Sequence, residues 1–249
     1  ARKLAPALAA GCSMILKASE ETPGTAVSLV RALSDAGLPD GVVNLVFGVP
    51  AEISEKMFAS EIVRKVSFTG SVPVGKQLAG LAASGLKRCT FELGGHSPSI
   101  VCEDADLESA LSTLTAFKFR NSGQVCIAPS RFFVHRSNYD AFVDGFVKAA
   151  KNQHLGNGLE EDTTMGPMSN VRRIESMEYL VQDAVTKGAK ILTGGKRRGD
   201  VGFFWEPTIL VDVPEDAEIM LVEPFGPIVP IIAFDSLEEV ISKANSLPY

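Results

Sequence analysis

Residues 63–93 read VRKVSFTGSVPVGKQLAGLAASGLKRCTFEL, and their pattern decides the fold. The stretch Val63–Phe68 predicts a strand, Val74–Ala83 predicts a helix, and Arg88–Leu93 predicts a second strand. A strand, a helix and a strand in succession are typical of a parallel sheet covered by helices. The sequence therefore predicts an α/β fold.

The same alternation continues on both sides of this stretch. Before it, strands are predicted at Ser13–Lys17 and Val42–Phe47, and helices at Thr25–Ala36 and Ala51–Ala59. After it, strands and helices are predicted at Ser99–Cys102, Leu107–Phe119, Arg131–Val134, Asn138–Ala150, Arg172–Lys187, Lys190–Thr193, Thr208–Val213, Ile228–Ala233 and Leu237–Ala244. Because the paired glycines 94 and 95 permit an unusual backbone path, a domain boundary is predicted between residues 1–93 and 94–249.

The composition argues against several classes of protein. A formal net charge of −6 disfavours a nucleic-acid partner, which would call for a basic face. No run approaches the roughly 20 apolar residues that span a bilayer, and the first residues do not form a secretory signal. The four cysteines and three histidines lack metal-clip spacing. We therefore expect a reduced, cytoplasmic protein without a metal site or a membrane partner.

Both ends of the sequence indicate a piece of a longer protein. The chain opens without methionine inside the helix-like run 2–10, and it stops directly after the helix-like Leu237–Ala244. We therefore expect a fragment truncated at both ends.

Residues 70–76, GSVPVGK, match the GxxxxGK pattern of a phosphate-binding loop. The next residue should be Ser or Thr to hold magnesium, but it is Gln77. Pro73 also lacks a backbone N–H, the group with which such a loop surrounds phosphates. A nucleotide-binding loop of this kind is kept as an alternative. A dinucleotide pyrophosphate at the same helix N-terminus needs no magnesium and fits better.

Cys126 follows the sequence FRNSGQV at residues 119–125. A lone cysteine is most often a small buried apolar residue. Here a Gly-Gln turn after a helix can expose the sulfur and direct backbone N–H groups at a developing oxyanion. Cys126 is therefore a candidate nucleophile.

Two acidic residues have unusual surroundings. Glu92 lies in the apolar strand, where burial of a carboxylate is costly unless the group is paired or functional. It is either part of a structural ion pair or a general base that takes a proton from water. Glu223 opens the sequence EPFGP at residues 223–227, which predicts a rigid turn. Such a turn could hold an acid and an aromatic ring against a ribose and a nicotinamide.

Taken in order, these motifs resemble the aldehyde dehydrogenase superfamily over nearly the whole chain. The resemblance rests on Lys17 and Glu20, FTGS at 68–71, ELGG at 92–95, GQVC at 123–126, and EPFGP at 223–227. Each motif is weak alone, but their order is highly specific. The resemblance implies that residues 1–93 are the later part of a Rossmann-like NAD-binding domain and residues 94–249 are most of an α/β catalytic domain.

The resemblance also implies a cofactor, NAD or NADP. Six residues would bind it: Lys17 and Glu20 the adenosine ribose, Gly70 and Ser71 the pyrophosphate, Glu223 the nicotinamide ribose, and Phe225 the ring. NAD is favoured because the Glu20 carboxylate would repel a 2′-phosphate, although Lys17 would partly offset that repulsion. The alternatives are an exposed Lys17–Glu20 ion pair and a Phe225 that belongs to the core.

The reaction implied is the oxidation of an aldehyde to its acid. The Cys126 thiolate attacks the aldehyde carbon, hydride passes to the nicotinamide, and Glu92 activates the water that releases the acid. The family's oxyanion asparagine is expected just before Ala1, and losing such a donor costs on the order of 10²–10³ in rate. We therefore expect the isolated chain to be inactive or impaired, and the full-length protein to be a homo-oligomer.

The sequence KFRN at residues 118–121 is similar to the succinate-semialdehyde dehydrogenase branch. There the arginine, here Arg120, grips the remote carboxylate of the substrate, a task that suits a guanidinium fork. The alternative is that Arg120 pairs with a structural acid. Ala128 stands where the branch often has a second cysteine, so no disulfide with Cys126 is expected.

Three rival functions stay open at this point. They are a P-loop nucleotide-binding protein, a non-catalytic NAD-binding relative, and an enzyme that passes the thioester to coenzyme A. The presence of Glu92 favours hydrolysis over transfer to coenzyme A.

Overall fold

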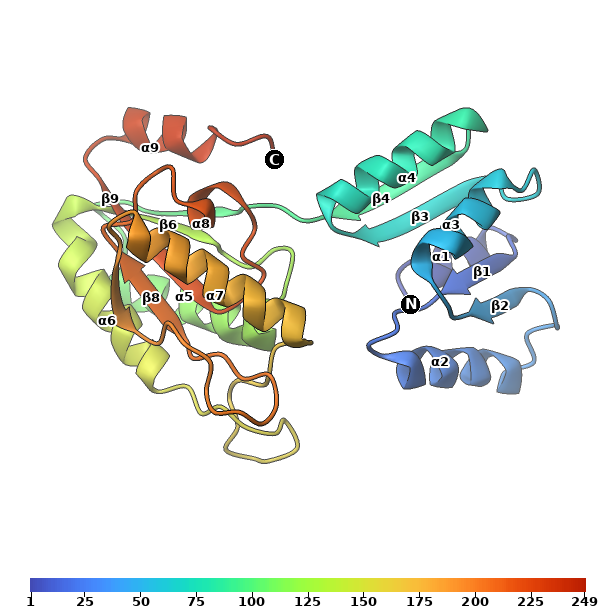
Figure 1. Cartoon of the computed structure of the whole chain (residues 1–249), viewed down its shortest axis with the longest axis horizontal. Helices are drawn as coiled ribbons and strands as arrows, with labels where there is room; N and C mark the ends of the chain where they lie inside the picture. The colour runs from blue at the N-terminus through green and yellow to red at the C-terminus, as the bar shows by residue number, and fades with distance from the viewer. The chain divides into compact units, whose positions relative to one another are not determined.

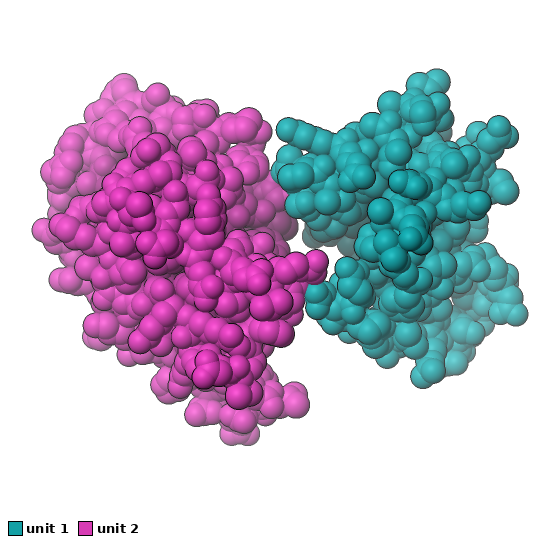
Figure 2. Space-filling view, in the orientation of Figure 1, with its two compact units in different colours: residues 1–93 teal, residues 94–249 magenta.

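The computed structural model describes residues 1–249, which divide into two compact units, residues 1–93 and residues 94–249 (Figure 2). No helix in either unit combines the length and the apolar character needed to cross a membrane.

The first unit contains two pairs of parallel strands and four helices (Figure 1). Its elements are α1 (Leu4–Ala9), β1 (Met14–Lys17), α2 (Pro23–Asp35), β2 (Val43–Val46), α3 (Pro50–Ala59), β3 (Lys65–Gly70), α4 (Val72–Ser84) and β4 (Arg88–Leu93). β1 pairs with β2, and β3 pairs with β4. Helices α2, α3 and α4 each have a proline in their first turn. Proline is favoured there because it lacks a backbone N–H, and the N–H groups of a first turn have no acceptor within the helix.

The second unit is built on a five-stranded sheet with the order β5-β6-β9-β8-β7. All neighbours are parallel except β7, which is antiparallel to β8. Its elements are β5 (Pro98–Val101), α5 (Leu107–Phe119), β6 (Arg131–His135), α6 (Tyr139–Lys151), α7 (Val171–Thr186), β7 (Lys190–Thr193), β8 (Thr208–Val211), α8 (Glu218–Leu221), β9 (Ile228–Phe234) and α9 (Leu237–Ala244), with 3-10 turns η1 (Arg120–Gly123) and η2 (Arg136–Asn138).

Successive residues of the central strands enter two different cores, one on each face of this sheet. Phe133, Leu210 and Ile228 pack with α7 and with Trp205. Their neighbours Phe132, Ile209 and Val229 pack with α5 and α6. Strands covered on both faces are apolar throughout, as in parallel sheets generally. The unit therefore has three layers, with α7 on one side of the sheet and α5 and α6 on the other (Figure 1).

Every strand and longer helix predicted from the sequence is confirmed to within a few residues. Two features differ. The four strands of the first unit form two separate two-stranded sheets. The sequence did not predict this pairing, because apolar periodicity indicates a strand but not the strand with which it pairs. The short helix α8 was not predicted, since four residues are too few to show a helical period.

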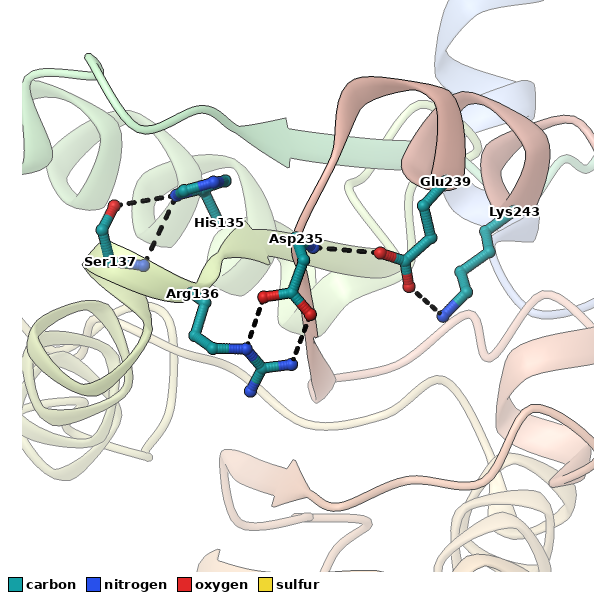
Figure 3. A network of polar contacts seen from close by, with 6 residues as sticks. All are labelled: His135, Arg136, Ser137, Asp235, Glu239 and Lys243. Carbon is teal, nitrogen blue, oxygen red and sulfur yellow. Dashed lines mark hydrogen bonds and ion pairs between the residues drawn. The ribbon is translucent and has the colours of Figure 1, made fainter.

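Polar contacts join the ends of the adjacent parallel strands β6 and β9 (Figure 3). Arg136 donates two hydrogen bonds to the Asp235 carboxylate, at 2.6 and 2.9 Å. The Asp235 backbone N–H donates to Glu239, which also pairs with Lys243 at 2.8 Å. The hydrogen bond from Arg136 lowers the pKa of Asp235. Because the side chains of Arg136 and Asp235 are largely exposed, their ion pair contributes little to the stability of the fold.

Candidate active site

Cys126 lies just beyond a sharply bent segment at the end of α5. Three successive residues have left-handed backbone angles: Asn121 with φ 50°, Ser122 with φ 55° and Gly123 with φ 73°. Each non-glycine residue in this region costs roughly 1–2 kcal/mol, so the surrounding structure must hold the bend in place. The Cys126 side chain is exposed, and its backbone N–H has no acceptor within the chain. The bend therefore presents a thiol together with a free N–H donor.

Side chains of the bend hold it against the segment that leads into α7. The Ser122 hydroxyl donates to the Gly166 carbonyl at 2.6 Å. The Gln124 amide accepts from the Ser169 N–H at 2.9 Å and donates to the Pro167 carbonyl at 3.3 Å. These bonds fix the backbone immediately before Cys126 and balance its strain.

The turn at residues 223–227 lies in backbone contact with this bend. A Cβ atom added to Gly123 would be 2.3 Å from the carbonyl oxygen of Gly226. One added to Gly226 would be 2.2 Å from the sulfur of Met177. Phe225 is itself left-handed, with φ 44°, and its side chain is half-buried rather than part of the core. The two predicted motifs, far apart in sequence, are thus packed together at glycines that tolerate no side chain.

The Glu223 carboxylate lies against the backbone of Gly94 and Gly95. A Cβ on Gly94 would be 2.1 Å from Oε2 of Glu223, and the Gly95 N–H donates to the carboxylate. Burial raises the pKa of Glu223, whereas the Gly95 hydrogen bond and the charges of Arg173 and Lys118 lower it. Glu223 is consequently a half-buried acceptor that lies against the backbone of Gly94 and Gly95, and two cations favour its charged form.

Those two cations were not predicted as site residues. Lys118, in the last turn of α5, is 1% exposed, and burial lowers its pKa to about 7 against the opposing effect of Glu223. A lysine in the apolar run AFKF at 116–119 is the signal that could have revealed it. Arg173 donates to the Pro224 carbonyl at 2.9 Å, and its guanidinium lies 6.0 Å from the Phe225 ring centroid. Its Nε is buried without a partner.

Arg120 is exposed at the C-terminal end of α5. Its side chain has neither a hydrogen bond nor an ion pair within this chain, so no structural acid partner is present among these 249 residues. Its five N–H donors remain available to an anionic group.

In the first unit, Lys17 and Glu20 form an ion pair at 3.0 Å, with side-chain exposures of 25% and 59%. Gly70 ends β3, and Ser71 is the N-cap residue of α4. Ser71 makes no capping hydrogen bond with its side chain, so its hydroxyl is available at the helix N-terminus. A helix N-terminus favours anions such as a pyrophosphate.

Glu92 requires a correction. It lies on β4, opposite Thr69 of β3, and its side chain is exposed rather than buried by the strand. The prediction from burial was wrong because β3 and β4 form an isolated pair whose alternate residues face outward. Glu92 instead has a cationic neighbour, Lys3, whose side chain hydrogen-bonds Thr69 and whose pKa Glu92 raises against the larger effect of burial.

The phosphate-loop alternative is also wrong. Helix α4 begins at Val72, so Gly75 and Lys76 lie inside a helix. The Gly75 N–H donates to the Ser71 carbonyl at 2.9 Å, and a Cβ on Gly75 would be 2.7 Å from a Leu93 methyl carbon. A residue packed in this way cannot contribute its N–H to a loop around phosphates.

Three features define the class of protein: the α/β fold, the exposed cysteine after a strained bend, and the acidic turn packed against that bend. Comparison of the whole sequence with known proteins gives the same class. The chain belongs to the aldehyde dehydrogenase family, whose model matches residues 1–249. It is 49% identical over 249 residues to a putative 4-(hydroxymethyl)benzenesulfonate dehydrogenase of Comamonas testosteroni, covering 100% of this chain and 52% of that protein. It is 40% identical over 248 residues to the succinate-semialdehyde dehydrogenase (NADP+) of Escherichia coli K12, covering 100% of this chain and 52% of that protein.

A solved structure gives the same relationship in three dimensions. The crystal structure of succinate-semialdehyde dehydrogenase from Burkholderia pseudomallei superposes with a TM-score of 0.97 at 42% identity, over 99% of this chain and 51% of that one. The chain therefore spans about half the length of the relatives it matches.

Proposed function

We propose that this chain supplies the nucleophile and much of the cofactor site of an NAD(P)-dependent aldehyde dehydrogenase. The observation that carries the proposal is the exposed Cys126 on a strained bend that packs against the Glu223–Pro227 turn. Backbone strain held by surrounding contacts is characteristic of functional sites. In this proposal residues 1–93 belong to the cofactor domain and residues 94–249 to the catalytic domain.

The thiolate of Cys126 attacks the aldehyde carbon and forms a tetrahedral thiohemiacetal. The free N–H of Cys126 donates to the resulting oxyanion. The bound nicotinamide cofactor supplies the hydride acceptor, which leaves a thioester on the cysteine. Glu92 takes a proton from water, and the hydroxide displaces the thiolate to release the acid.

The cofactor would be held by polar groups at three places. The Lys17–Glu20 pair offers a donor and an acceptor to the adenosine ribose, and Ser71 offers a hydroxyl to the pyrophosphate. Glu223 offers a carboxylate to the hydroxyls of the nicotinamide ribose, with Phe225 beside the ring. NAD is favoured by the Glu20 charge. NADP remains compatible because Lys17 can approach a 2′-phosphate.

We propose that the aldehyde carries an anionic group at its far end, and that the unpaired Arg120 binds this group. A succinate-type semialdehyde is the first candidate, supported by the relatives of that name. A sulfonated aromatic aldehyde is the second, supported by the name of the relative at 49% identity. A guanidinium recognises both carboxylate and sulfonate oxygens through paired N–H donors.

The test uses the full-length enzyme, meaning a protein of the relatives' length that contains this sequence. NAD(P)H formation is measured with succinate semialdehyde, a sulfonated benzaldehyde and propanal, with each cofactor. Cys126→Ala should abolish turnover, and Cys102→Ala, a half-buried cysteine of the same unit, should not. Glu92→Gln should retain one stoichiometric burst of NAD(P)H but lose steady-state turnover, because the thioester forms and is not hydrolysed.

Turnover that survives Cys126→Ala would contradict the mechanism. Cofactor binding without any turnover would favour a non-catalytic relative, and thioester release that depends on coenzyme A would favour the acylating alternative. Arg120→Met should raise the KM for the two anionic aldehydes and leave that for propanal unchanged. An equal effect on all three would remove the substrate assignment only.

A further inference from the structure

Helix α8 depends on contacts from outside itself. It has four residues, Glu218–Leu221, and its N-cap residue, Ala217, has no side chain that could accept a hydrogen bond. Because the first turn of a helix is unfavourable to form, a helix of this length needs partners elsewhere in the fold. Only Val222 separates α8 from Glu223. Whatever fixes α8 therefore also fixes the start of the acidic turn.

A carboxylate from α7 supplies the missing cap. Oδ2 of Asp183 accepts from the backbone N–H of Glu218 at 2.7 Å. Oδ1 of Asp183 pairs with Lys187 at 2.9 Å, and Lys187 donates to the Asp216 carbonyl at 2.7 Å. The Glu218 N–H, followed by Lys187, lowers the pKa of Asp183, so the cap is charged and suits the positive end of a helix. The start of α8 is thus joined to α7 on both sides of Ala217.

One turn of α8 connects this cap to the acid. Glu218, whose N–H is bound by Asp183, accepts with its own carbonyl from the Val222 N–H at 3.0 Å. Val222 is the residue directly before Glu223. A shift of the Glu218 backbone therefore reaches the Glu223 backbone through a single hydrogen bond and a single peptide bond.

The same long helix holds the segment on the other side of Glu223. Arg173, in the first turn of α7, donates to the Pro224 carbonyl at 2.9 Å. Asp183 lies in the last turn of α7. Residues 216–224 are therefore bound to α7 at both ends of that helix, and Glu223 lies between the two points of attachment.

We propose that Asp183 is a positioning residue that, by capping α8, holds the Glu223 carboxylate where it accepts from the ribose hydroxyls of the nicotinamide cofactor. This inference rests on the cofactor role proposed above for Glu223. Asp183 acts through the backbone of α8 and not by contact with the cofactor. The Gly95 N–H donates to the carboxylate end of Glu223, so the cap on α8 fixes the backbone end of the same residue.

The test measures the equilibrium Kd of NAD+ and NADP+ by calorimetry, with the full-length enzyme in a Cys126→Ala background so that no reaction intervenes. Asp183→Ala removes the cap and should weaken binding of the preferred cofactor about tenfold, within the range expected from a lost helix cap. Asp183→Asn keeps an oxygen that can accept from the Glu218 N–H, so its Kd should stay within about twofold of the parent value. Glu178→Ala, which removes an exposed acid of the same helix, is the control and should leave the Kd unchanged.

Amide hydrogen exchange of the cofactor-free protein gives a second readout. Asp183→Ala should speed exchange in residues 218–223, because the Val222 N–H loses its fixed acceptor, and Asp183→Asn should retain the slow exchange of the parent. If the Asp183→Ala protein does not fold, Asp183→Leu, whose side chain has a similar shape but no acceptor, takes its place in both measurements.

A double-mutant cycle separates positioning of the acid from a structural role. In a Glu223→Ala background, Asp183→Ala should cause little further loss of affinity, because no carboxylate remains to be positioned. Equal losses of affinity with and without Glu223 would overturn the inference. So would a parental Kd in Asp183→Ala together with a lower free energy of unfolding, or unchanged exchange in residues 218–223. A parent enzyme that binds neither cofactor would instead contradict the proposed function, and this inference with it.

Discussion

Gly123 and Gly226 meet through their backbones, so closely that a Cβ atom on Gly123 would lie 2.3 Å from the carbonyl oxygen of Gly226. This contact joins the bend before Cys126 to the turn that begins at Glu223. Because no side chain separates the two segments, the position of the thiol depends directly on the position of the acidic turn.

Gly123→Ala should lower kcat/KM of the full-length enzyme by about 100-fold, because the methyl group must displace the backbone beside Cys126 by the order of an ångström. Gly199→Ala is a closely matched control. Gly199 has a similar φ of +67°, against +73° for Gly123, but nothing lies within 4 Å of its added Cβ. The control should therefore show only the backbone strain, about 1–2 kcal/mol of stability, with activity unchanged. Equal activity losses in the two variants would contradict the packing argument.

Ser122→Ala should destabilise the protein more than Ser122→Gly does, although glycine is usually the more destabilising of the two residues. Both substitutions remove the hydroxyl that donates to the Gly166 carbonyl at 2.6 Å, but only glycine relieves the left-handed φ of 55°. Both variants should lose about 1–3 kcal/mol, and glycine should retain about 1 kcal/mol more than alanine. The measurement is denaturant unfolding of the 249-residue chain followed by Trp205, its single and buried tryptophan. A more stable alanine variant would show that the bend is not strained.

His96 should make the second unit sensitive to acid. Its Nε2 lies 3.0 Å from the Ile219 carbonyl, which can only accept, so this nitrogen carries the hydrogen and Nδ1 accepts from the Ser130 hydroxyl at 2.8 Å. Burial, followed by the charge of Arg131, lowers the pKa of His96 to about 3 from its usual 6.5. Between pH 6.5 and about pH 3, His96 is protonated in the unfolded chain but not in the folded chain. The free energy of unfolding therefore falls as the pH falls.

The expected slope is at most about 1.4 kcal/mol per pH unit, the value for one proton. It should be measured from pH 7 to pH 4 by unfolding monitored at Trp205. His96→Gln can still donate to the Ile219 carbonyl and should reduce the slope by up to one proton, whereas His154→Gln, an exposed histidine, should not change it. An unchanged slope in His96→Gln would assign the acid sensitivity to other groups.

Arg173→Ala should weaken cofactor binding about tenfold, because the guanidinium holds the Pro224 carbonyl and covers the Phe225 ring. Arg173→Lys should recover little of this loss, since an ammonium group lacks the planar guanidinium that lies over the Phe225 ring. The Kd of NAD(P)+ is the measurement, with Arg198→Ala, an exposed arginine of the same unit, as the control. If Arg173→Lys restored the full affinity for NAD(P)+, the positive charge of Arg173 alone would account for its effect.

The α/β alternation and the strand and helix positions were available from the sequence, because apolar spacing of two or of three to four residues is a local property. So was the order of motifs that identifies the family. The exposure of Glu92 could not be predicted from the sequence. It depends on which strands pair with β4, and apolar periodicity does not indicate the pairing. The burial of Lys118 gave only a faint local signal, a cation inside an apolar run.

The sequence by itself determined the elements of this protein, its family and the identity of Cys126 and Glu223 as candidates. Only the tertiary structure decided that Gly123 contacts Gly226 and that Arg173 lies over Phe225. The physical reason is the distance along the chain. Each of these contacts joins residues separated by dozens of positions, and they meet because the sheet and its connections bring the loops to one place.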